Sequence, residues 1–433
     1  MNPLTFDTLK EIVSGNATAL RRVVELQPAG GPGAKVFPPT YEGGKYATEK
    51  RRINGELVDC VLLDSVQSQA NRMELALQEA VDEGRISLPV ITVDFSQTRA
   101  AFVGRVTSLE APHRIADAIL RDSEGEDGNG NRVPFRRTSA GAALDTVSLQ
   151  NATALFGYCP TALVFGMWDS TGARGGLGVK FPRAIVSEII GIGAVPGQRT
   201  GGRLDPLQIS SKAGKVYETE DGDWTLDPAK AKPKTKKDKD GNEIPTLYGK
   251  SGKPSEINHG NVTPSLMVQK DQNGNPIDRS GTPTTRMDEW IPIGGFTIDR
   301  AQQITLISLP TLRRLRFPVN GNNNADLSGR TALTALALCA ATLSGEKGYN
   351  LRSQCDLYVA SGVPQWEIPG QTEAFSLNAE DAVKLFNQAV EEAKNAGLPW
   401  NSAGMKLTPR ADLVEMVLRS RERGGEEQGE EEA

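Results

Sequence analysis

The stretch VDCVLLDSVQSQANRMELALQEAVD, residues 58–82, contains a short apolar run followed by a longer amphipathic one. Residues 58–63 are rich in β-prone side chains and predict a strand. From Ser65 to Asp82, apolar residues recur at helical spacing and predict a helix with one apolar stripe. The stripe consists of Val66, Ala70, Met73, Leu77 and Val81. This strand and helix belong to the α+β fold class that we expect for the chain.

Other apolar runs extend the pattern along the sequence. Strands are expected at residues 90–95, 101–106, 161–168 and 181–190, and helices at residues 8–13, 112–121, 331–343, 379–396 and 411–419. Residues 144–157 fit a helix, and residues 296–309 fit either type of element. Between Leu204 and Trp290 the apolar runs are short and Gly, Pro, Lys, Asn and Asp dominate, which indicates an insertion.

Composition places the chain among soluble globular proteins. It has 433 residues, of which 38% are hydrophobic and 24% are charged. We expect a cytoplasmic protein without a membrane partner, because there is no apolar run of about 18 residues and no secretory signal in residues 1–10. No zinc site is expected from the four cysteines, which are far apart in sequence: Cys60, Cys159, Cys339 and Cys355. Cys60 and Cys339 lie in apolar runs and are expected to be buried apolar side chains.

Charge is distributed unevenly, although the formal net charge is -5. Residues 421–433 contain six glutamates and two arginines and predict a disordered, solvated tail. Residues 230–253 contain eight lysines and three acidic residues, which fits either a long basic hairpin or a disordered loop, with a turn at residues 240–242. Any contact with a polyanion must therefore be local.

The strand-to-helix junction at residues 62–74 is the first candidate site. Ser65, Ser68 and Arg72 fall near one helix face beside Asn71, where free backbone amides of the helix start attract anions such as phosphate. The alternative is an ordinary helix cap by Asp64 or Ser65. A cap does not account for Ser68, Asn71 and Arg72, so both interpretations remain open.

Residues 168–183, which include the glycine-rich segment 172–178, form the second candidate site. Its spacing excludes the phosphate loop of nucleotide hydrolases and the dinucleotide fingerprint. With Arg174, Lys180 and Arg183 it is suited to following a polyanionic strand, and a plain turn is the alternative. A third, more scattered basic group comprises Lys212, Arg313, Arg314 and Arg316, for which surface charge is the simpler explanation.

Catalytic and metal-binding arrangements are poorly supported. The two histidines, His113 and His259, lie outside nucleophile motifs, and no pair of carboxylates stands out for acid–base work. His259 is the better functional candidate, although local hydrogen bonding within its Asn/Gly-rich loop explains it equally simply. No cofactor and no metal are expected.

Several motifs together resemble the backbone subunit of type I-G (formerly I-U) CRISPR effector complexes, a member of the RAMP superfamily. They are LLDSVQSQANRME at 62–74, GMWDST at 166–171, RGGLG at 174–178, PSEINHGN at 254–261, LPTLRRLRF at 309–317 and GYNLRS at 348–353. The resemblance spans roughly residues 37–357 and depends on the order of the motifs.

The resemblance implies a modified RRM-like, or ferredoxin-like, palm with long finger- and thumb-like insertions. Residues 1–203 and 291–420 would form the palm, residues 204–290 a basic thumb-like insertion, and residues 421–433 lie outside the match. Copies of the subunit would polymerise along a CRISPR RNA (crRNA) and hold its phosphates, while base pairing reads the target DNA. The expected RNA contacts are Ser65, Ser68, Asn71, Arg72, Arg174, Lys180, Arg183, Lys212, His259, Arg313 and Arg314.

Such a subunit would be non-catalytic and would work with the other subunits of a Cascade complex. These partners include a large subunit, a guide-processing subunit and a recruited helicase-nuclease. One rival interpretation is a type III-like backbone subunit that cuts target RNA with a divalent metal, for which Asp64 or Asp169 would have to serve. Two further rivals are a metabolic enzyme for a phosphorylated substrate and a purely structural assembly protein.

Overall fold

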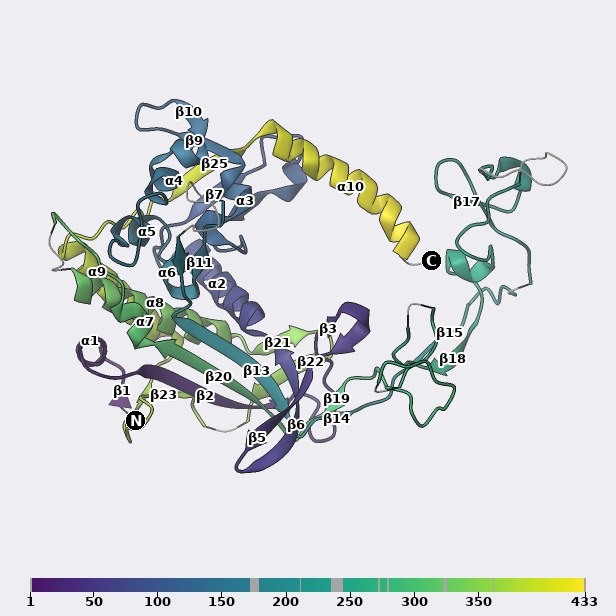
Figure 1. Ribbon diagram of the computed structural model, residues 1–433, viewed down its shortest axis with the longest axis horizontal. Coiled ribbons are helices and arrows are strands. Elements are labelled where there is room, and N and C mark those ends of the chain that lie inside the picture. Colours follow the sequence, from purple (N-terminus) through teal and green to yellow (C-terminus); the bar gives the residue numbers. More distant parts are fainter. Residues whose placement is uncertain are drawn as a thin grey trace. The chain divides into compact units, whose positions relative to one another are not determined.

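The chain divides into two compact units (Figure 1). The computed structural model describes residues 2–171, 179–210, 212–234, 244–271, 273–278, 280–321, 325–360 and 362–431. Unit 1 consists of Met1–Glu42, Tyr46–Val195 and Phe296–Val414, and unit 2 of Gly43–Lys45, Pro196–Gly295 and Glu415–Ala433. Residues 204–290, the range of the predicted insertion, lie within the Pro196–Gly295 segment of unit 2.

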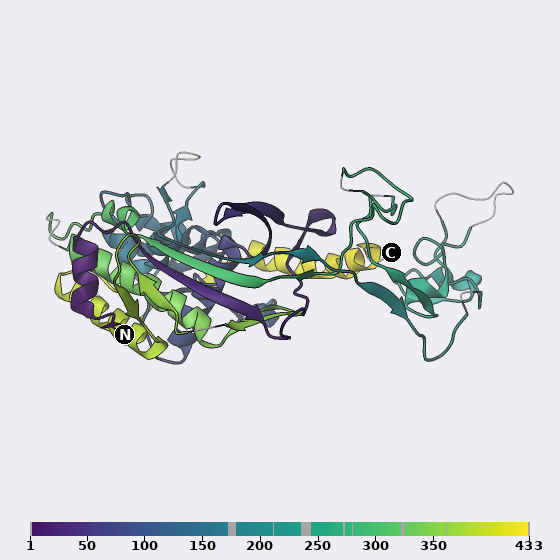
Figure 2. The same ribbon diagram turned by 90° about the horizontal axis from the view of Figure 1, so that it is seen from below.

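A large sheet forms the centre of unit 1, and its long strands run side by side in Figures 1 and 2. The strand order is β1, β24, β23, β2, β20, β13, β6, β5, and β22 also pairs with β2 and with β21. The bounds are β1 Asn2–Pro3, β2 Ala19–Pro28, β5 Thr48–Ile53, β6 Glu56–Asp64, β13 Ile185–Ile192, β20 Arg300–Ser308, β21 Tyr349–Arg352, β22 Cys355–Val359, β23 Gln365–Glu367 and β24 Ala374–Ser376.

Chain order and strand order together define the core of this sheet. Along the chain, β2 is followed by helix α2 (Val66–Asp82), then by β13, β20, helix α8 (Asp326–Glu346) and β22. In space the order is β22, β2, β20, β13, and every neighbouring pair is antiparallel. This is the βαββαβ arrangement of ferredoxin-like folds, extended by β6 and β5 beside β13. The expected α+β class is confirmed.

Alternating burial explains how the sheet is covered. In β20, Ala301, Gln303, Thr305 and Ile307 are buried and the residues between them are partly exposed, because successive side chains of a strand point to opposite faces. Helices α2 and α8 contact each other and the sheet. Helix α8 is packed on its other side by α1 (Phe6–Ser14) and α9 (Ala379–Asn395).

Helix α8 owes its position to its sequence of small and apolar residues. It is the one described helix whose length and apolar character would suit a membrane crossing, and 83% of its most apolar window is buried inside the protein. Such burial is typical of a core helix in a globular protein. All four cysteines are buried and free, and the burial of Cys60 and Cys339 confirms what their apolar surroundings in the sequence predicted.

A second sheet in unit 1 has the order β10, β9, β25, β7, β8. Its strands are β7 Ile91–Asp94, β8 Arg105–Thr107, β9 Ser123–Glu126, β10 Arg132–Pro134 and β25 Met405–Pro409. Other short elements of unit 1 are α3 Ala118–Arg121, α4 Ser139–Ala143, α5 Thr153–Tyr158, α6 Thr161–Phe165, α7 Leu309–Arg313, β11 Met167–Trp168, β12 Lys180–Phe181 and β19 Phe296–Thr297. Strands β11 and β12 pair as an antiparallel hairpin.

Several predictions from the sequence differ from the structure. The strand expected at residues 101–106 is a 3-10 helix at Ala101–Val103, and only β8 is extended. The helix expected at residues 112–121 is reduced to a 3-10 turn at Arg114–Ala116 and to α3, and the helix that fitted residues 144–157 is reduced to α5. The strand expected at residues 161–168 is wrong, because α6 occupies Thr161–Phe165 and only β11 is extended. All five residues of α6 are buried, so its sequence has no alternation that would separate a helix from a buried strand. Likewise, the disordered tail expected at residues 421–433 is replaced by helix α10, which spans Ala411–Glu431.

Unit 2 is built from short strands. They are β15 Thr200–Arg203, β16 Tyr217–Glu218, β17 Trp224–Thr225 and β18 Val262–Leu266. Strands β4 Lys45–Tyr46 and β14 Val195–Pro196 each have one residue in either unit, and β3 Thr40–Tyr41 belongs to unit 1. The described base of the lysine-rich segment is a hairpin, because Thr246 donates its amide to the Lys232 carbonyl at 2.8 Å and Lys234 donates to Ile244 at 2.8 Å. The turn expected at residues 240–242 lies outside the described residues.

Candidate nucleic-acid interface

The junction between β6 and α2 begins with a helix cap. Ser65 has an extended backbone, and its hydroxyl accepts a hydrogen bond from the Ser68 amide at 3.2 Å. This is the usual arrangement of an N-cap serine and satisfies one of the free amides of the first turn. Ser68 is half-buried and Asn71 is exposed. The structural interpretation of Ser65 is therefore confirmed, and its predicted phosphate contact would have to share the capping hydroxyl.

Asp64, the residue before the cap, is completely buried. Its carboxylate accepts hydrogen bonds from Gln69 Nε2 at 2.6 Å, Arg72 Nε at 2.9 Å and an Arg352 terminal nitrogen at 3.2 Å. A buried carboxylate is tolerated when it is paired and hydrogen-bonded in this way. Asp64 thus joins the end of β6 to α2 and to β21.

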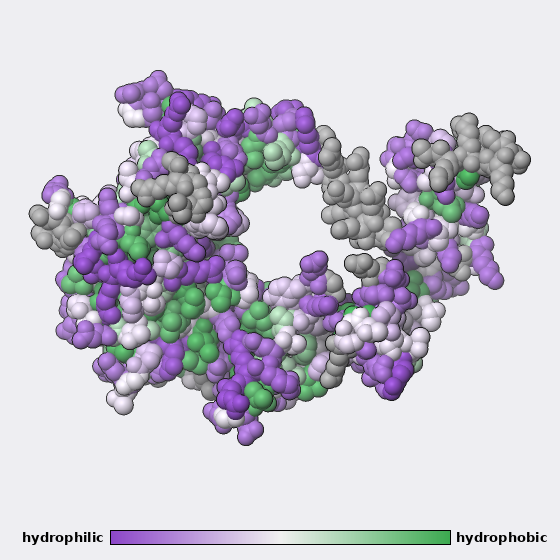
Figure 3. Space-filling view, viewed as in Figure 1, coloured by the Kyte–Doolittle hydropathy of each residue, from purple (hydrophilic) through white to green (hydrophobic). Residues whose placement is uncertain are grey.

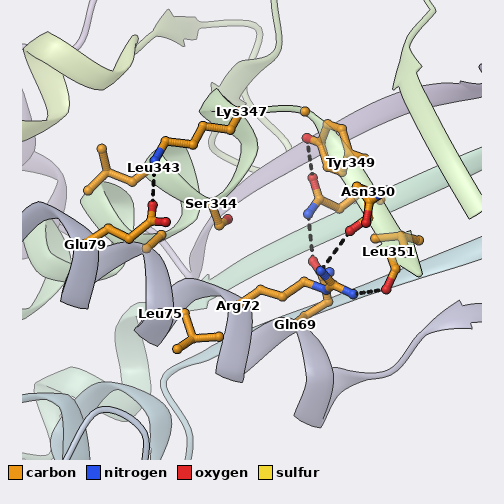
Figure 4. Close-up of a pocket in the computed structure, with 13 residues that line it drawn as sticks. Gln69, Arg72, Leu75, Glu79, Leu343, Ser344, Lys347, Tyr349, Asn350 and Leu351 are labelled. Atoms are coloured by element: carbon orange, nitrogen blue, oxygen red, sulfur yellow. Dashed lines mark hydrogen bonds and ion pairs between the residues drawn. The ribbon is translucent and has the colours of Figure 1, made fainter. Parts of the chain in front are cut away.

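Arg72 points toward β21 (Figure 4). One terminal nitrogen donates to the Asn350 carbonyl at 3.1 Å and the other donates to the Leu351 carbonyl. The side chain lines a pocket of about 190 Å³ formed by α2, the end of α8 and β21. All three guanidinium nitrogens consequently have protein acceptors, while 32% of the side chain stays exposed. Arg72 fixes β21 against α2, and its predicted contact with RNA stays a prediction.

A buried polar network continues from this junction under the helices. Gln69 accepts hydrogen bonds from Ser187 Oγ at 3.0 Å and Gln303 Nε2 at 2.7 Å, and Gln303 in turn accepts one from the Tyr349 hydroxyl at 3.0 Å. Burial raises the pKa of Tyr349, so its hydroxyl remains a donor at neutral pH. The network fixes α2 to β13, β20 and β21. None of the residues in this network was among the predicted site residues.

The β11–β12 hairpin brings an aromatic ring and a cation together. Trp168 and Lys180 face each other across the two strands, and the Lys180 Nζ lies 5.7 Å from the Trp168 ring centroid. This is within the range of a cation–π interaction. Lys180 is exposed, and 53% of Trp168 is exposed. Trp168 was not among the predicted contacts. Its position opposite a predicted basic residue could have been found only by recognising the hairpin.

A buried ion pair lies beside this hairpin. Arg114 donates to both Glu74 oxygens at 2.6 and 2.7 Å and to the Gly166 carbonyl at 2.9 Å. The two side chains are only 7% and 3% exposed. Burial raises the pKa of Glu74 to about 7, while Arg114 and then Arg183 act in the opposite direction. Neither residue of the pair was predicted to belong to the site.

Arg183 follows β12 and lies against the same group. A Cβ added to Gly166 would be 2.9 Å from the Arg183 Cγ, so the side chain passes directly over this glycine. Burial lowers the pKa of the half-buried Arg183, and repulsion from Arg114 lowers it further, whereas Glu74 raises it. Arg174, the third predicted cation of this segment, lies outside the described residues.

The other predicted residues are distributed over both units. Arg313 is half-buried and donates to the Val13 carbonyl at 3.4 Å, so it supports the end of α1. Arg314, the next residue, is exposed. In unit 2, Lys212 is exposed and His259 is half-buried. Within unit 1, Lys180 and Arg183 thus lie beside one short segment, at Trp168 and Gly166 respectively.

The turn that contains His259 has its own support. The Asp205 carboxylate accepts hydrogen bonds from the Gly260 amide and from the Leu207 amide at 3.0 Å, and these donors lower the pKa of Asp205. Arg203 donates to the Gly260 carbonyl at 2.9 Å. Asn258 adopts the left-handed conformation that such a tight turn needs. Local hydrogen bonding thus explains the shape of this motif.

In the view of Figure 3, polar residues cover much of the visible surface and apolar patches interrupt them.

Residues 20–196 match the family described as CRISPR-associated protein GSU0053. The match extends from β2 to the end of β14 and includes α2, the β11–β12 hairpin and β13. It indicates a CRISPR-associated protein family and suggests a role in CRISPR defence. No curated protein matches the chain.

Proposed function

We propose that this protein is a non-catalytic backbone subunit of a type I-G CRISPR effector complex, in the RAMP superfamily. In the proposed role, copies polymerise along a crRNA in the cytoplasm, hold its phosphates and leave its bases free to pair with target DNA. The match to a CRISPR-associated family and the ferredoxin-like sheet support this role. The large subunit, the guide-processing subunit and the helicase-nuclease would supply recognition, guide maturation and cleavage.

The observation that carries the proposal is the pair of cations on the β11–β12 hairpin. Within the described part of the chain, Lys180 and Arg183 have no carboxylate partner, although most other arginines of unit 1 are paired with Asp or Glu. Cations without a protein counter-ion are available to bind phosphate. Local binding of this kind is compatible with a net charge of -5.

A cleaving type III-like role is less well supported. It would require Asp64 or Asp169 to bind a divalent metal. Asp64 is completely buried and paired with arginines, and Asp169 is 2% exposed and accepts a hydrogen bond from Arg136 at 2.7 Å. Both carboxylates are therefore already neutralised within the protein. Cleavage of a complementary RNA strand by the purified subunit with Mg²⁺ or Mn²⁺ would contradict the non-catalytic role.

The test is coexpression of the chain with a crRNA, followed by titration of the purified protein with guide RNA at several salt concentrations. We expect nucleic acid to copurify, which raises the ratio of absorbance at 260 and 280 nm. The double variant Lys180→Ala/Arg183→Gln should bind more weakly and show a salt slope that is shallower by about 0.7 for each lost phosphate contact.

The matched control is Lys384→Ala/Lys394→Ala. It removes the same number of cations from α9, where Lys384 is paired with Glu380 and Lys394 with Glu391. The control should keep the affinity and salt slope of the unsubstituted chain. Equal affinities for both double variants would argue against the hairpin as the contact. Self-association is tested by light scattering with guides of increasing length, and a mass that does not grow with guide length would contradict polymerisation.

A further inference from the structure

Trp168 is an exposed aromatic residue on the β11–β12 hairpin. It lies on a two-residue strand, its side chain is 53% exposed, and the neighbouring Met167 and Phe181 are buried. The Lys180 ammonium group lies over the ring, and about half of Trp168 remains exposed to solvent. A planar ligand can therefore pack against the ring without a change of fold.

Arg183 supplies a place for an anion next to this ring. The like-charged Arg114 is close, and both oxygens of the nearby Glu74 are already bonded to Arg114. Arg183 itself has no hydrogen-bonded carboxylate among the described residues. A half-buried guanidinium beside another one gains most from a ligand that brings negative charge.

The distance between the two features suits one nucleotide. Arg183 passes over Gly166, the residue that caps the end of α6 two residues before Trp168, so the backbone positions of Gly166 and Trp168 are at most about 7 Å apart. Lys180 stands opposite Trp168 and adds a second cation at the ring. A ligand with a flat ring and a phosphate on either side of it matches this arrangement.

We infer that Trp168 stacks one base of a single-stranded nucleic acid while Arg183 and Lys180 bind the adjoining phosphates. This inference rests on the proposed function and adds a base contact to it. Stacking on an aromatic side chain does not depend on sequence, because every base has a π face. The protein would therefore hold one base at this position whatever its identity.

The test uses the full chain and two fluorescein-labelled probes of equal length, an oligouridylate and an abasic ribose-phosphate oligomer. The probes share their phosphates and differ only in the bases. The unsubstituted chain should bind the oligouridylate more tightly, and Trp168→Ala should reduce this preference by about tenfold, because one stacked base contributes roughly 1–3 kcal/mol. Trp168→Phe should retain most of the preference.

Two controls separate stacking from loss of structure. Tyr358→Ala removes another half-exposed aromatic residue of unit 1 and should leave the preference unchanged. Quenching of tryptophan fluorescence by oligouridylate should be reduced in Trp168→Phe, which keeps an aromatic ring at the site. This second readout does not depend on affinity.

The outcomes distinguish the inference from the proposed function. If the unsubstituted chain binds RNA and Trp168→Ala weakens both probes equally, or neither, stacking is excluded and the phosphate contacts stand. If the unsubstituted chain binds neither probe nor guide RNA, the proposed function fails and the inference fails with it. A phosphoserine peptide that competes as strongly as oligouridylate would also overturn the inference.

Discussion

Arg72 donates its Nε to the Oδ2 of the completely buried Asp64 at 2.9 Å. Arg72→Ala would leave that carboxylate with Gln69 and the longer bond from Arg352, and would release β21. We expect a loss of about 2 kcal/mol in the free energy of unfolding, which is below the full cost of breaking a buried pair because Arg72 is one-third exposed. Urea unfolding of Arg72→Ala and of the unsubstituted chain measures this loss.

The double variant Asp64→Asn/Arg72→Ala provides the control for this prediction. It removes the buried charge together with its partner, so it should be less destabilised than the sum of the two single variants. Additive losses would show that Arg72 stabilises the fold only through the β21 carbonyls.

Removing one partner of the Glu74–Arg114 pair should destabilise the fold more than Arg72→Ala does, because this pair is almost fully buried. Arg114→Ala leaves the Glu74 carboxylate without its two hydrogen bonds and should cost about 3–5 kcal/mol of unfolding free energy. Thermal or urea unfolding of the full chain checks this value. Arg121→Ala, which removes an arginine that is 37% exposed and paired with Asp122, is the matched control and should cost less than about 1 kcal/mol.

Gly166 should not tolerate a side chain. Its φ is +86°, and an added Cβ would lie 2.9 Å from the Arg183 Cγ and 3.1 Å from the Arg183 amide nitrogen. Gly166→Ala should therefore lower the melting temperature and weaken RNA binding by displacing Arg183. Gly31→Ala is the matched control, since Gly31 has φ +84° and nothing within 4 Å of its added Cβ. Gly31→Ala should lose only the stability that a side chain costs at positive φ, about 1–2 kcal/mol, and should bind RNA normally.

The Asp205 turn should loosen in acid. Because the Gly260 and Leu207 amides lower the pKa of Asp205, its contribution to stability is present above the ordinary aspartate pKa and is lost as the pH falls through the lowered folded value. Hydrogen exchange of the Gly260 amide, corrected for the intrinsic pH dependence, should accelerate in that window. Asp205→Asn should exchange rapidly at every pH. Unchanged protection in Asp205→Asn would contradict this assignment.

The elements that could be predicted from sequence are those with a clear local period. Strand β6 and helix α2 were expected within one or two residues, because their apolar residues alternate or recur at helical spacing. Helix α6 was misassigned because all its residues are buried. The order of strands depends on contacts between distant segments, and here it followed from the family resemblance rather than from the apolar pattern.

In the candidate site, too, local features could be predicted from the sequence and long-range contacts could not. Lys180 and Arg183 were expected from the basic, glycine-rich segment, whereas Trp168 was missed because its role depends on the pairing of β11 with β12. Arg72 was expected to face Ser65 and Ser68, but its acceptors lie near residue 350, far along the chain. Sequence spacing places residues on one helix face but does not reveal which distant carbonyls compete for their side chains.

The insertion between β13 and β20 leaves and re-enters the sheet at adjacent positions. Ile192 pairs with Arg300, and the Asp299 amide donates to the Ile192 carbonyl at 2.9 Å. Since this pairing already holds the two ends together, the entropy of closing the connection rises by only about 0.6 kcal/mol when its length doubles. We therefore expect that segments of other lengths, including a short turn, can replace residues 196–295 without changing the register of the ferredoxin-like sheet.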